Sequence, residues 1–408
     1  MISGREEVYG KEKRMKLKRL IAAAAAAVLC LTGAGCSKSQ ESSGSTADSS
    51  AAEDSAQTAR VFNTELTAMQ LTADIKIGWN LGNTLDATGG SGLSQETSWG
   101  NPSVTQELIQ AVSDAGFNAI RVPTTWERQM DENGTISADW MARVQEIVDY
   151  AYDLDMYVIL NMHHEEWYQP YADKEEEITA KLQNSWTQIA ENFKDYDQHL
   201  IFEGMNEPRW KNTDFEWNGG NDEGRTVVNH LNKAFVDAVR ATGGNNQYRF
   251  LMVCPYAANS TESALAALEL PDDDRLIVSV HAYIPYSFAL AQPGTDKWLA
   301  SKPNCTRDID TLAEVLDRLF ISKGQAVIVG ECGAMNRDNE DYRAQWAQYY
   351  FSKFKEIGIP CFWWDNGAFL SGETFGLFDR SLNTVRYPIL LEGMMKGASG
   401  EAPAEDAA

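Results

Sequence analysis

Residues 200–208 read LIFEGMNEP and combine the two features on which the fold prediction depends. An apolar start is followed by a polar pair, Asn206 and Glu207, directly before Pro208. Strands buried on both faces of a parallel sheet carry such apolar runs, and polar residues at their carboxyl ends are typical of a ligand site. The segment therefore predicts a central strand with functional side chains at its end.

Seven further segments have the same form: IKIGWNLGN (75–83), AIRVPT (119–124), YVILNMHH (157–164), RFLMVCP (249–255), LIVSVHAY (276–283), AVIVGECG (326–333) and CFWWDNG (361–367). Between them, apolar residues recur three and four positions apart, as at Met141, Val144 and Val148, which predicts helices with one apolar face. Eight such units predict an α/β fold with a single catalytic domain, a (β/α)8 TIM barrel, over residues 61–398. The alternative, a doubly wound sheet, usually has fewer strands and a glycine-rich phosphate turn, and the sequence has no GxGxxG motif.

The first 36 residues have the layout of a secretory signal. Basic residues between Lys11 and Arg19 precede the apolar run 21–31, which is shorter than the roughly 20 residues of a membrane-spanning helix. The segment LTGAGC (31–36) resembles a bacterial lipoprotein cleavage site, in which Cys36 would be acylated. Gly33 stands where such sites usually carry Leu or Val, so ordinary signal cleavage and secretion is the alternative. Met15 is an alternative first residue to Met1.

Two further segments are poor in large apolar side chains. Residues 37–60 are mainly Ser, Ala, Thr and acidic residues and predict a disordered linker, and residues 399–408 predict a short disordered tail. Together with the signal, this composition predicts an exported protein that is anchored to the bacterial cell surface or is secreted.

The charge balance limits the partners. Acidic residues outnumber basic ones by 59 to 35, for a formal charge of −24. This disfavours nucleic acid and anionic lipid surfaces, so the one membrane contact expected is a lipid anchor at Cys36. Cys254, Cys305, Cys332 and Cys361 lack CxxC spacing, which disfavours a metal knuckle or a disulfide scaffold. Neither their pairing nor the oligomeric state follows from the sequence.

Two carboxylates, Glu207 and Glu331, end strands on roughly opposite sides of the predicted barrel mouth. Cleavage of a glycosidic bond with retention needs one acid that protonates the leaving oxygen and one ionised nucleophile, about 5 Å apart. Arg121 and the Tyr283 hydroxyl are expected to keep Glu331 ionised, and Glu331 in turn to hold a proton on Glu207. Asn206 can donate to the neighbouring sugar hydroxyl.

A single carboxylate at a barrel rim often caps a helix or pairs with Arg, so the case for catalysis depends on the whole set of polar strand ends. Glu203 lies deeper in its strand than Glu207 and is predicted to be a buried partner of Arg or His.

Together, the motifs IRVPTTW, LNMHHE, FEGMNEPR, VSVHAY, VIVGECGA and FWWDNG resemble those of glycoside hydrolase family 5 across residues 64–396. The segments IGWNLGNTLDA, WGNP and GLFDR are similar to its subfamily 4, whose members cleave β-1,4-glucans such as cellulose, mixed-linkage glucan, xyloglucan and glucomannan. The resemblance implies that Glu207 is the acid/base and Glu331 the nucleophile. The candidate substrate-binding residues are Asn80, Arg121, His163, His164, Asn206, His281, Tyr283 and Trp364, with Trp364 preferred to Trp363 as the sugar platform.

No metal or cofactor is expected. His163 and His164 lack a further His four residues on, and adjacent strand residues point to opposite faces. His163 is expected to bind substrate or to orient a carboxylate, and His164 to contact Glu203 or a loop carbonyl. Indoles in strand ends and loops can line a sugar cleft, whereas three Trp residues inside helical patterns are expected in the core: Trp140, Trp186 and Trp346.

The sequence thus predicts a retaining endo-β-1,4-glucanase whose partner is a β-glucan polysaccharide. A noncatalytic glycan-binding surface lipoprotein and a metal-dependent barrel hydrolase are the alternatives. The preferred β-glycan, including xylan, and the choice between endo and exo action depend on loop shapes that a sequence does not give.

Overall fold

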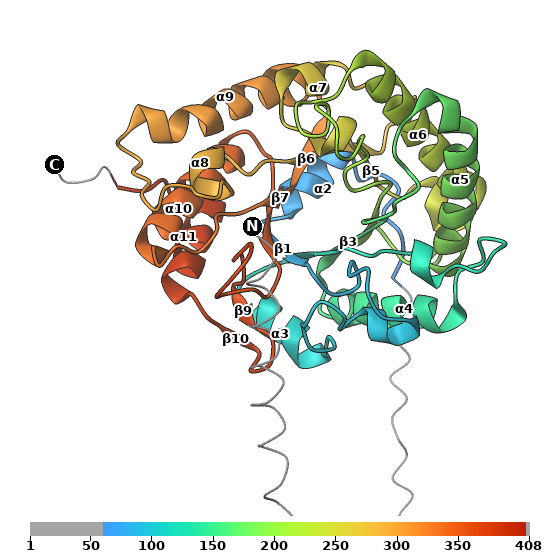
Figure 1. Ribbon diagram of the computed structural model, residues 1–408, viewed down its shortest axis with the longest axis horizontal. Helices are drawn as coiled ribbons and strands as arrows, with labels where there is room; N and C mark the ends of the chain where they lie inside the picture. Colours follow the sequence, from blue (N-terminus) through green and yellow to red (C-terminus); the bar gives the residue numbers. More distant parts are fainter. Residues whose placement is uncertain (1–59, 405–408) are drawn as a thin grey trace, which may run out of the picture. The chain divides into compact units, whose positions relative to one another are not determined.

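The computed structural model describes residues 60–404, in which eight parallel strands close into a barrel in sequence order. Figure 1 shows these strands at the centre of the molecule with helices around them. The strands are β1 (Gly78–Leu81), β2 (Ala119–Val122), β3 (Tyr157–Asn161), β4 (Leu200–Glu203), β5 (Leu251–Val253), β6 (Leu276–His281), β7 (Ala326–Cys332) and β8 (Cys361–Asp365). The predicted (β/α)8 barrel is confirmed.

Each strand is followed by a helical connection, as parallel neighbours require. The α-helices are α2 (Ala68–Asp74), α3 (Gln106–Asp114), α4 (Ala138–Tyr152), α5 (Glu175–Asn192), α6 (Asp222–Ala241), α7 (Glu262–Ala266), α8 (Tyr286–Ala289), α9 (Pro303–Leu319), α10 (Glu340–Glu356) and α11 (Pro388–Ala398). The loops carry the short 3-10 helices η1 (Gly92–Gln95), η2 (Glu127–Gln129), η3 (Ala172–Lys174), η4 (Gly244–Gln247), η5 (Tyr256–Ala258) and η6 (Ile321–Lys323), and the hairpin of β9 (Phe378–Asp379) and β10 (Thr384–Val385).

The barrel interior changes from apolar to polar along the strands. At the amino ends, Leu71 of α2 and Ile75 directly after it pack against strand residues such as Ile159, Ile201 and Phe362, so α2 closes this end. Nearer the carboxyl ends, the inward positions are polar and buried: Asn80, Arg121, Asn161, Glu203 and Ser279. The polar layer forms the floor of the barrel mouth.

All eight strands end earlier than predicted. β4 stops at Glu203 and β3 at Asn161, because the chain then leaves the hydrogen-bonded ladder to begin a βα loop. Asn206, Glu207, His163 and His164 therefore lie on loop segments, where strand alternation does not fix the direction of a side chain.

The first described residue, Arg60, contacts the barrel. Arg60, assigned to the linker, donates to the carbonyl of Tyr152 at 3.0 Å and pairs with Asp155 at 3.0 Å. The predicted signal, its Cys36 and the linker up to residue 59 lie outside the described residues. The four cysteines of the barrel are free thiols. Within residues 60–404, no helix has the length and apolar character to cross a membrane.

Candidate active site

Glu207 and Glu331 meet at the mouth of the barrel. One carboxylate oxygen of each and a ring nitrogen of His281 all lie within 4.8 Å of one another. The Glu207 side chain is 15% exposed and that of Glu331 is 7% exposed, so both remain open to the mouth. This separation suits a retaining carboxylate pair, whose groups lie about 5–5.5 Å apart, better than an inverting pair.

A break in the strand register brings Glu331 to this position. Ile328 points into the barrel, so simple alternation would place residue 330 inward and residue 331 outward. The pairing of β6 with β7 shifts after Val280, so that His281 lies opposite Glu331. A Cβ on Gly330 would lie 3.2 Å from Ser279 Oγ and 3.4 Å from His281 Nε2. Glycine therefore lets the chain pass under His281 while Glu331 turns to the mouth.

Arg121 holds the floor of the site together. Its guanidinium donates to Glu203 at 2.7 Å, Asn80 at 2.9 Å, Glu331 at 2.8 Å and Asn206 at 2.7 Å. Burial would lower the pKa of Arg121, but Glu203 and Glu331 raise it above its ordinary value. The residue is therefore a permanent cation under the nucleophile candidate.

Glu203 has the buried role that its depth in the strand predicted. It accepts hydrogen bonds from Arg121, from Asn161 at 2.9 Å and from Ser279 at 2.5 Å. Asn80 and Arg121 are fully buried, so the structure corrects the expectation that they contact substrate. They support the groups above them, because the ladder places both side chains inside the barrel.

His281 lies between the two catalytic candidates. Its Nδ1 is 2.8 Å from Glu207 Oε1 and 3.7 Å from Glu331 Oε2. Burial would raise the pKa of Glu207, but the hydrogen bond and the charge of His281 outweigh it and lower that pKa to about 2. Burial would lower the pKa of His281, but Glu331 and Glu207 raise it above its ordinary value.

His281 and Glu207 therefore share a proton across their 2.8 Å hydrogen bond. The expectation that Glu331 holds the proton on Glu207 stays a prediction, and His281 is a further partner of that proton. The sequence did not show that an imidazole would lie between the carboxylates.

The expected partners of Glu331 are present. Arg121 donates to Oε1 at 2.8 Å, and the Tyr283 hydroxyl donates to Oε2 at 2.8 Å. Burial and the charge of Glu331 raise the pKa of Tyr283 well above its ordinary value, so the phenol remains a donor. Both oxygens of Glu331 thus accept from groups that favour a carboxylate.

His163 and His164 face the same part of the mouth, with ring centroids 4.4 Å apart. The expectation that they point to opposite faces is wrong, because β3 ends before them. Asn161 donates to His163 Nδ1 at 3.0 Å, which leaves the proton on Nε2, and burial lowers the pKa of His163 well below its ordinary value. His163 is thus a neutral donor.

His164 lies beside Asp86, with 4.0 Å between His164 Nε2 and Asp86 Oδ2, and not beside Glu203. Burial lowers the pKa of His164 to about 4 and raises that of Asp86 to about 6. Ligand atoms of Asp86, His163 and His164 lie within 4.8 Å of one another, as do those of the Glu207, His281 and Glu331 set. The absence of a metal stays a prediction, and strand parity no longer supports it.

Trp364 and Trp363 have separate environments. Trp364 lies parallel to His163, with 5.7 Å between ring centroids and 2° between planes, and packs with Phe375 and Met335 at the mouth. Trp363 is fully buried and donates through Nε1 to the carbonyl of Phe375 at 3.0 Å. Trp364 is therefore the indole of the pair that can face a sugar.

The backbone at Gly82 lies close against the Trp364 ring and fixes its position. A Cβ on Gly82 would lie 2.7 Å from that ring. Only a residue without a side chain fits there.

Comparison with known proteins identifies the family. Residues 82–370 match the model of the cellulase family, glycosyl hydrolase family 5. The chain belongs to glycoside hydrolase family 5. It is 48% identical to endoglucanase B of Ruminococcus albus over 346 residues, which cover 84% of this chain and 83% of that protein.

Two solved structures of family 5 enzymes resemble the barrel closely. A broad-specificity subfamily 4 endoglucanase of Ruminococcus champanellensis with bound cellotriose has a TM-score of 0.79 at 45% identity, covering 81% of this chain and 99% of that one. A xyloglucan-specific endo-β-1,4-glucanase from a metagenomic library, in complex with cellotriose, has a TM-score of 0.78 at 44% identity, covering 80% and 98%. This family 5 member is a glycoside hydrolase with a (β/α)8 barrel.

The indoles of this family 5 enzyme are mostly core residues. Trp140, Trp186 and Trp346 are fully buried, as predicted. Among the indoles of strand ends and loops, Trp79, Trp126, Trp210 and Trp298 are also buried, Trp167 is half-buried, and Trp99 and Trp217 are 42% and 55% exposed. Trp99 lies 5.6 Å from His164 by ring centroids. Trp99, Trp167 and Trp217 are therefore the three of these seven indoles that are exposed enough to meet a glucan.

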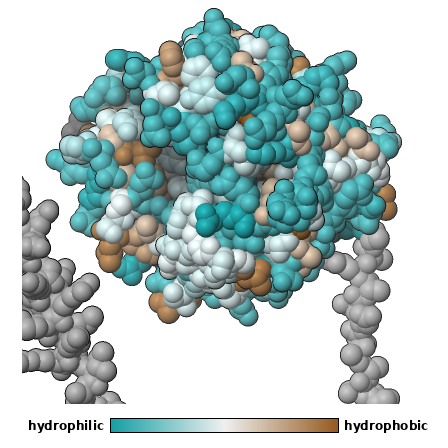
Figure 2. Space-filling view, turned by 45° about the vertical axis from the view of Figure 1, so that its right-hand side comes forward, coloured by the Kyte–Doolittle hydropathy of each residue, from teal (hydrophilic) through white to brown (hydrophobic). Residues whose placement is uncertain are grey.

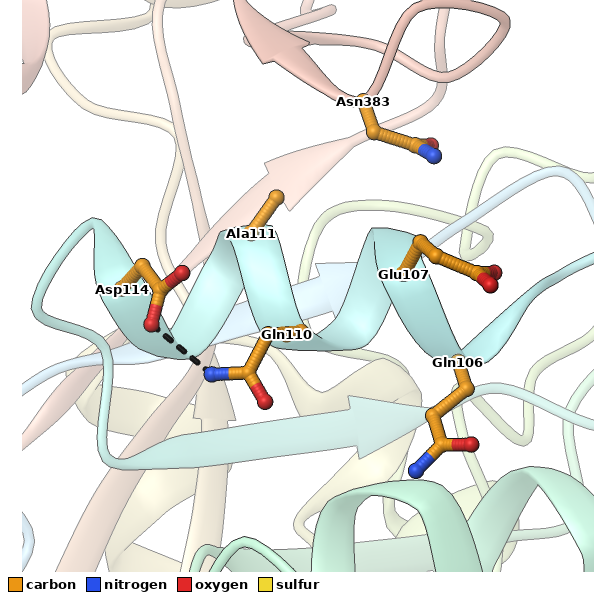
Figure 3. A pocket seen from close by; sticks show the side chains of 6 residues that line it. All are labelled: Gln106, Glu107, Gln110, Ala111, Asp114 and Asn383. Carbon is orange, nitrogen blue, oxygen red and sulfur yellow. Dashed lines mark hydrogen bonds between the residues drawn. The ribbon is translucent and has the colours of Figure 1, made fainter.

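A separate surface hollow of about 310 Å³ lies outside the family 5 site. It is formed by polar residues on α3, including Gln110 and Asp114, and by Asn383 of the β9–β10 hairpin (Figure 3). No catalytic candidate and no aromatic ring lines it.

Hydrophilic residues dominate the face in Figure 2, and hydrophobic ones occur singly or in small groups.

The sequence did not assign a role to Arg209 of the family 5 enzyme. Its Nη1 lies 3.3 Å from Glu207 Oε2 and 2.9 Å from the Glu207 carbonyl oxygen. The signal was a cation two residues after a candidate acid. Asn161 and Ser279 were also missed, because uncharged strand residues give no sign of the partner that they meet across a barrel.

Proposed function

We propose that this protein is a retaining endo-β-1,4-glucanase that cleaves β-1,4-linked glucans by double displacement. One observation carries the proposal: a carboxylate oxygen of Glu207, one of Glu331 and a nitrogen of His281 lie within 4.8 Å of one another at the barrel mouth. The pair is asymmetric, because Glu331 is bound by Arg121 and Tyr283, and Glu207 shares a proton with His281.

In the first step, Glu331 attacks the anomeric carbon and the bond to the leaving oxygen breaks. The proton of the His281–Glu207 pair passes through Glu207 to that oxygen, so Glu207 ends the step as a carboxylate. In the second step, Glu207 accepts a proton from water, which attacks the anomeric carbon and releases Glu331. Arg121 and Tyr283 stabilise Glu331 as it regains its charge.

Substrate contacts come from side chains that border the mouth. Trp364 offers a flat apolar ring for a sugar, and His163 offers its Nε2 proton to a hydroxyl. Asn206 is oriented by Arg121, which binds its Oδ1 and leaves its amide protons for the sugar hydroxyl next to the reacting carbon. His164 and Trp99 extend this surface away from the carboxylates.

The test is release of reducing ends from soluble mixed-linkage β-glucan by purified protein, with the anomer followed by nuclear magnetic resonance. We expect the β-anomer to appear first and Glu331→Gln to lose at least about 10³-fold in rate. Glu166→Gln is the control, because Glu166 is an exposed glutamate that pairs with Lys211 outside the carboxylate pair. Undiminished activity in Glu331→Gln would disprove the assignment.

The same assay separates the alternatives. A noncatalytic glycan-binding protein would bind glucan without releasing reducing ends, and nothing in the comparisons supports this alternative. A metal-dependent hydrolase would lose activity on chelation, whereas a mechanism with two carboxylates keeps it.

The enzyme is proposed to accept more than one β-1,4-glucan. Relatives include a broad-specificity enzyme and a xyloglucan-specific one, so cellulose, mixed-linkage glucan, xyloglucan and glucomannan are all candidate substrates. A product profile on these polymers and on xylan, with chain-length analysis, distinguishes endo from exo cleavage.

We also propose that the enzyme is exported and anchored to the cell surface through Cys36. The basic and apolar layout of residues 11–31 supports export, and LTGAGC (31–36) supports acylation of Cys36. Labelled palmitate should be incorporated into the wild type and not into Cys36→Ala. Equal labelling, or no labelling in either protein, would count against the anchor.

A further inference from the structure

The two oxygens of Glu207 have different partners. Oε1 contacts His281, and Oε2 contacts Arg209. Glu207 lies beyond the last residue of β4, so ladder hydrogen bonds do not fix its backbone. Arg209 instead binds both the carbonyl and the carboxylate of Glu207 through Nη1, at 2.9 Å and 3.3 Å.

Arg209 is itself fixed by the loop that follows β4. Its Nε lies 3.2 Å from Glu216 Oε1, and its guanidinium carbon lies 4.0 Å from the ring centroid of Trp217. Only 14% of the Arg209 side chain is exposed, whereas Trp217 is 55% exposed. The indole thus covers the guanidinium, which strengthens the charge interactions beneath it.

The partners of Arg209 are also anchored. Glu216 Oε2 accepts from the Asn212 amide at 2.8 Å, and the carbonyl of Trp217 accepts from Asn259 at 3.0 Å. Residues 209–217 therefore form a clamp around Arg209, and the clamp is tied to the segment that follows β5.

We propose that Arg209, held by Glu216 and Trp217, is a positioning residue that sets the orientation and the acid strength of Glu207. The inference rests on the proposed function. When the glycosidic bond breaks, the Glu207 O–H bond also breaks, its electron pair stays on Glu207 and the proton goes to the leaving oxygen. Arg209 faces the negative charge that this leaves on Oε2, so it favours proton release.

The proposal predicts a defect that depends on the leaving group. Aryl β-cellobiosides test this directly, because their phenols differ in basicity and carry no sugar that could bind beyond the cleaved bond. Phenyl β-cellobioside needs a proton from Glu207, and 2,4-dinitrophenyl β-cellobioside departs without one. The value of kcat/KM reports the first chemical step for both substrates.

For Arg209→Met we expect kcat/KM on the phenyl substrate to fall roughly 10- to 100-fold and that on the dinitrophenyl substrate to change less than about threefold. Arg209→Lys should recover part of the loss, and Trp217→Ala should show the same pattern at smaller size. Arg225→Met is the matched control, because Arg225 binds the carbonyl of Gly219 in the same loop at 2.7 Å and belongs to no Glu207 contact. It should not alter the ratio of the two substrates.

Glu207→Gln tests the acid role of Glu207 separately from the positioning role of Arg209. If Glu207→Gln shows leaving-group dependence and Arg209→Met does not, the positioning role is wrong and the proposed function stands. If Glu207→Gln shows none, the acid assignment itself fails. Equal loss on both substrates in Arg209→Met would mean a purely structural role. If Arg209→Met does not fold, Arg209→Lys and Trp217→Phe carry the same comparison.

Discussion

His281 Nδ1 lies 2.8 Å from Glu207 Oε1 and 3.7 Å from Glu331 Oε2, so one imidazole faces both carboxylates. The far nitrogen of the ring, Nε2, has no hydrogen-bond partner within residues 60–404. The imidazole therefore acts on the site through Nδ1, and the proton that it holds is the one nearest to the acid/base.

The alkaline limit of activity should depend on His281. In the wild type, the His281–Glu207 pair keeps its proton above the ordinary histidine pKa of 6.5, because both carboxylates raise the pKa of His281. In His281→Asn, Glu207 alone holds the proton, so the alkaline limb of kcat/KM should move to lower pH. His199→Asn is the control, since His199 pairs with Asp197 outside the site. An unchanged limb in His281→Asn would contradict the prediction.

Substitution of Trp363 should lower the stability of the fold, and substitution of Trp364 should lower the activity. Trp363→Phe leaves the buried carbonyl of Phe375 without its donor and should cost about 1–3 kcal/mol of unfolding free energy. Trp364→Ala should instead lower kcat/KM on cellooligosaccharides roughly tenfold or more, because a sugar platform is lost. Thermal unfolding and steady-state kinetics on both variants check this. The reverse pattern would show that the platform has been assigned to the wrong indole.

Removal of the Glu203 charge should destabilise the barrel. Glu203→Gln leaves Arg121 with less compensation in a fully buried site, and such losses typically cost about 3–5 kcal/mol. Glu177→Gln breaks an exposed, solvent-screened pair with Lys181 and should leave the unfolding free energy almost unchanged. Urea unfolding measures both. Similar small effects would mean that water replaces the lost partner.

Glu165 should make the fold less stable at higher pH. Burial raises its pKa to about 8, although it accepts from the amides of Trp126 at 2.6 Å and Glu127 at 2.8 Å. Between its ordinary pKa of 4.5 and about 8, the folded protein holds a proton that the unfolded chain releases. The unfolding free energy should therefore fall as pH rises through this range, by an amount of order a few kcal/mol.

Chemical denaturation from pH 4 to 9 measures this slope. Between the raised pKa of Asp86, about 6, and that of Glu165, about 8, Glu165→Gln should reduce the slope whatever its absolute stability, and Glu176→Gln, an exposed change at the start of α5, should not. A variant slope equal to that of the wild type would assign the dependence to other groups.

The strands and the polar strand ends could be predicted because both are local patterns. Apolar runs such as 326–329 lie inside the barrel wall, and Glu331 follows one of them. The position of His281 between the carboxylates could not be predicted, because it depends on a register shift between β6 and β7. Adjacent strands produce that shift together, and neither sequence shows it alone.

The loops were predicted least well, because their side chains are set by contacts between distant segments. Trp210 is buried since it stacks on Tyr171 at 4.7 Å and donates to the carbonyl of Pro170 at 2.7 Å. Arg209 gains its role only when Trp217 folds over it. A single sequence gives the residue types of a loop but not which of them meet.

The Arg121 guanidinium donates to residues on β1, β4, β7 and the segment after β4. The position of the nucleophile Glu331 therefore depends on several strands of the barrel at once. A molecule in which one of these strands has separated from its neighbour would therefore lose the geometry around Glu331. Turnover and an intact tertiary fold should vanish at the same denaturant concentration, which makes the rate of glucan cleavage a direct gauge of the folded fraction.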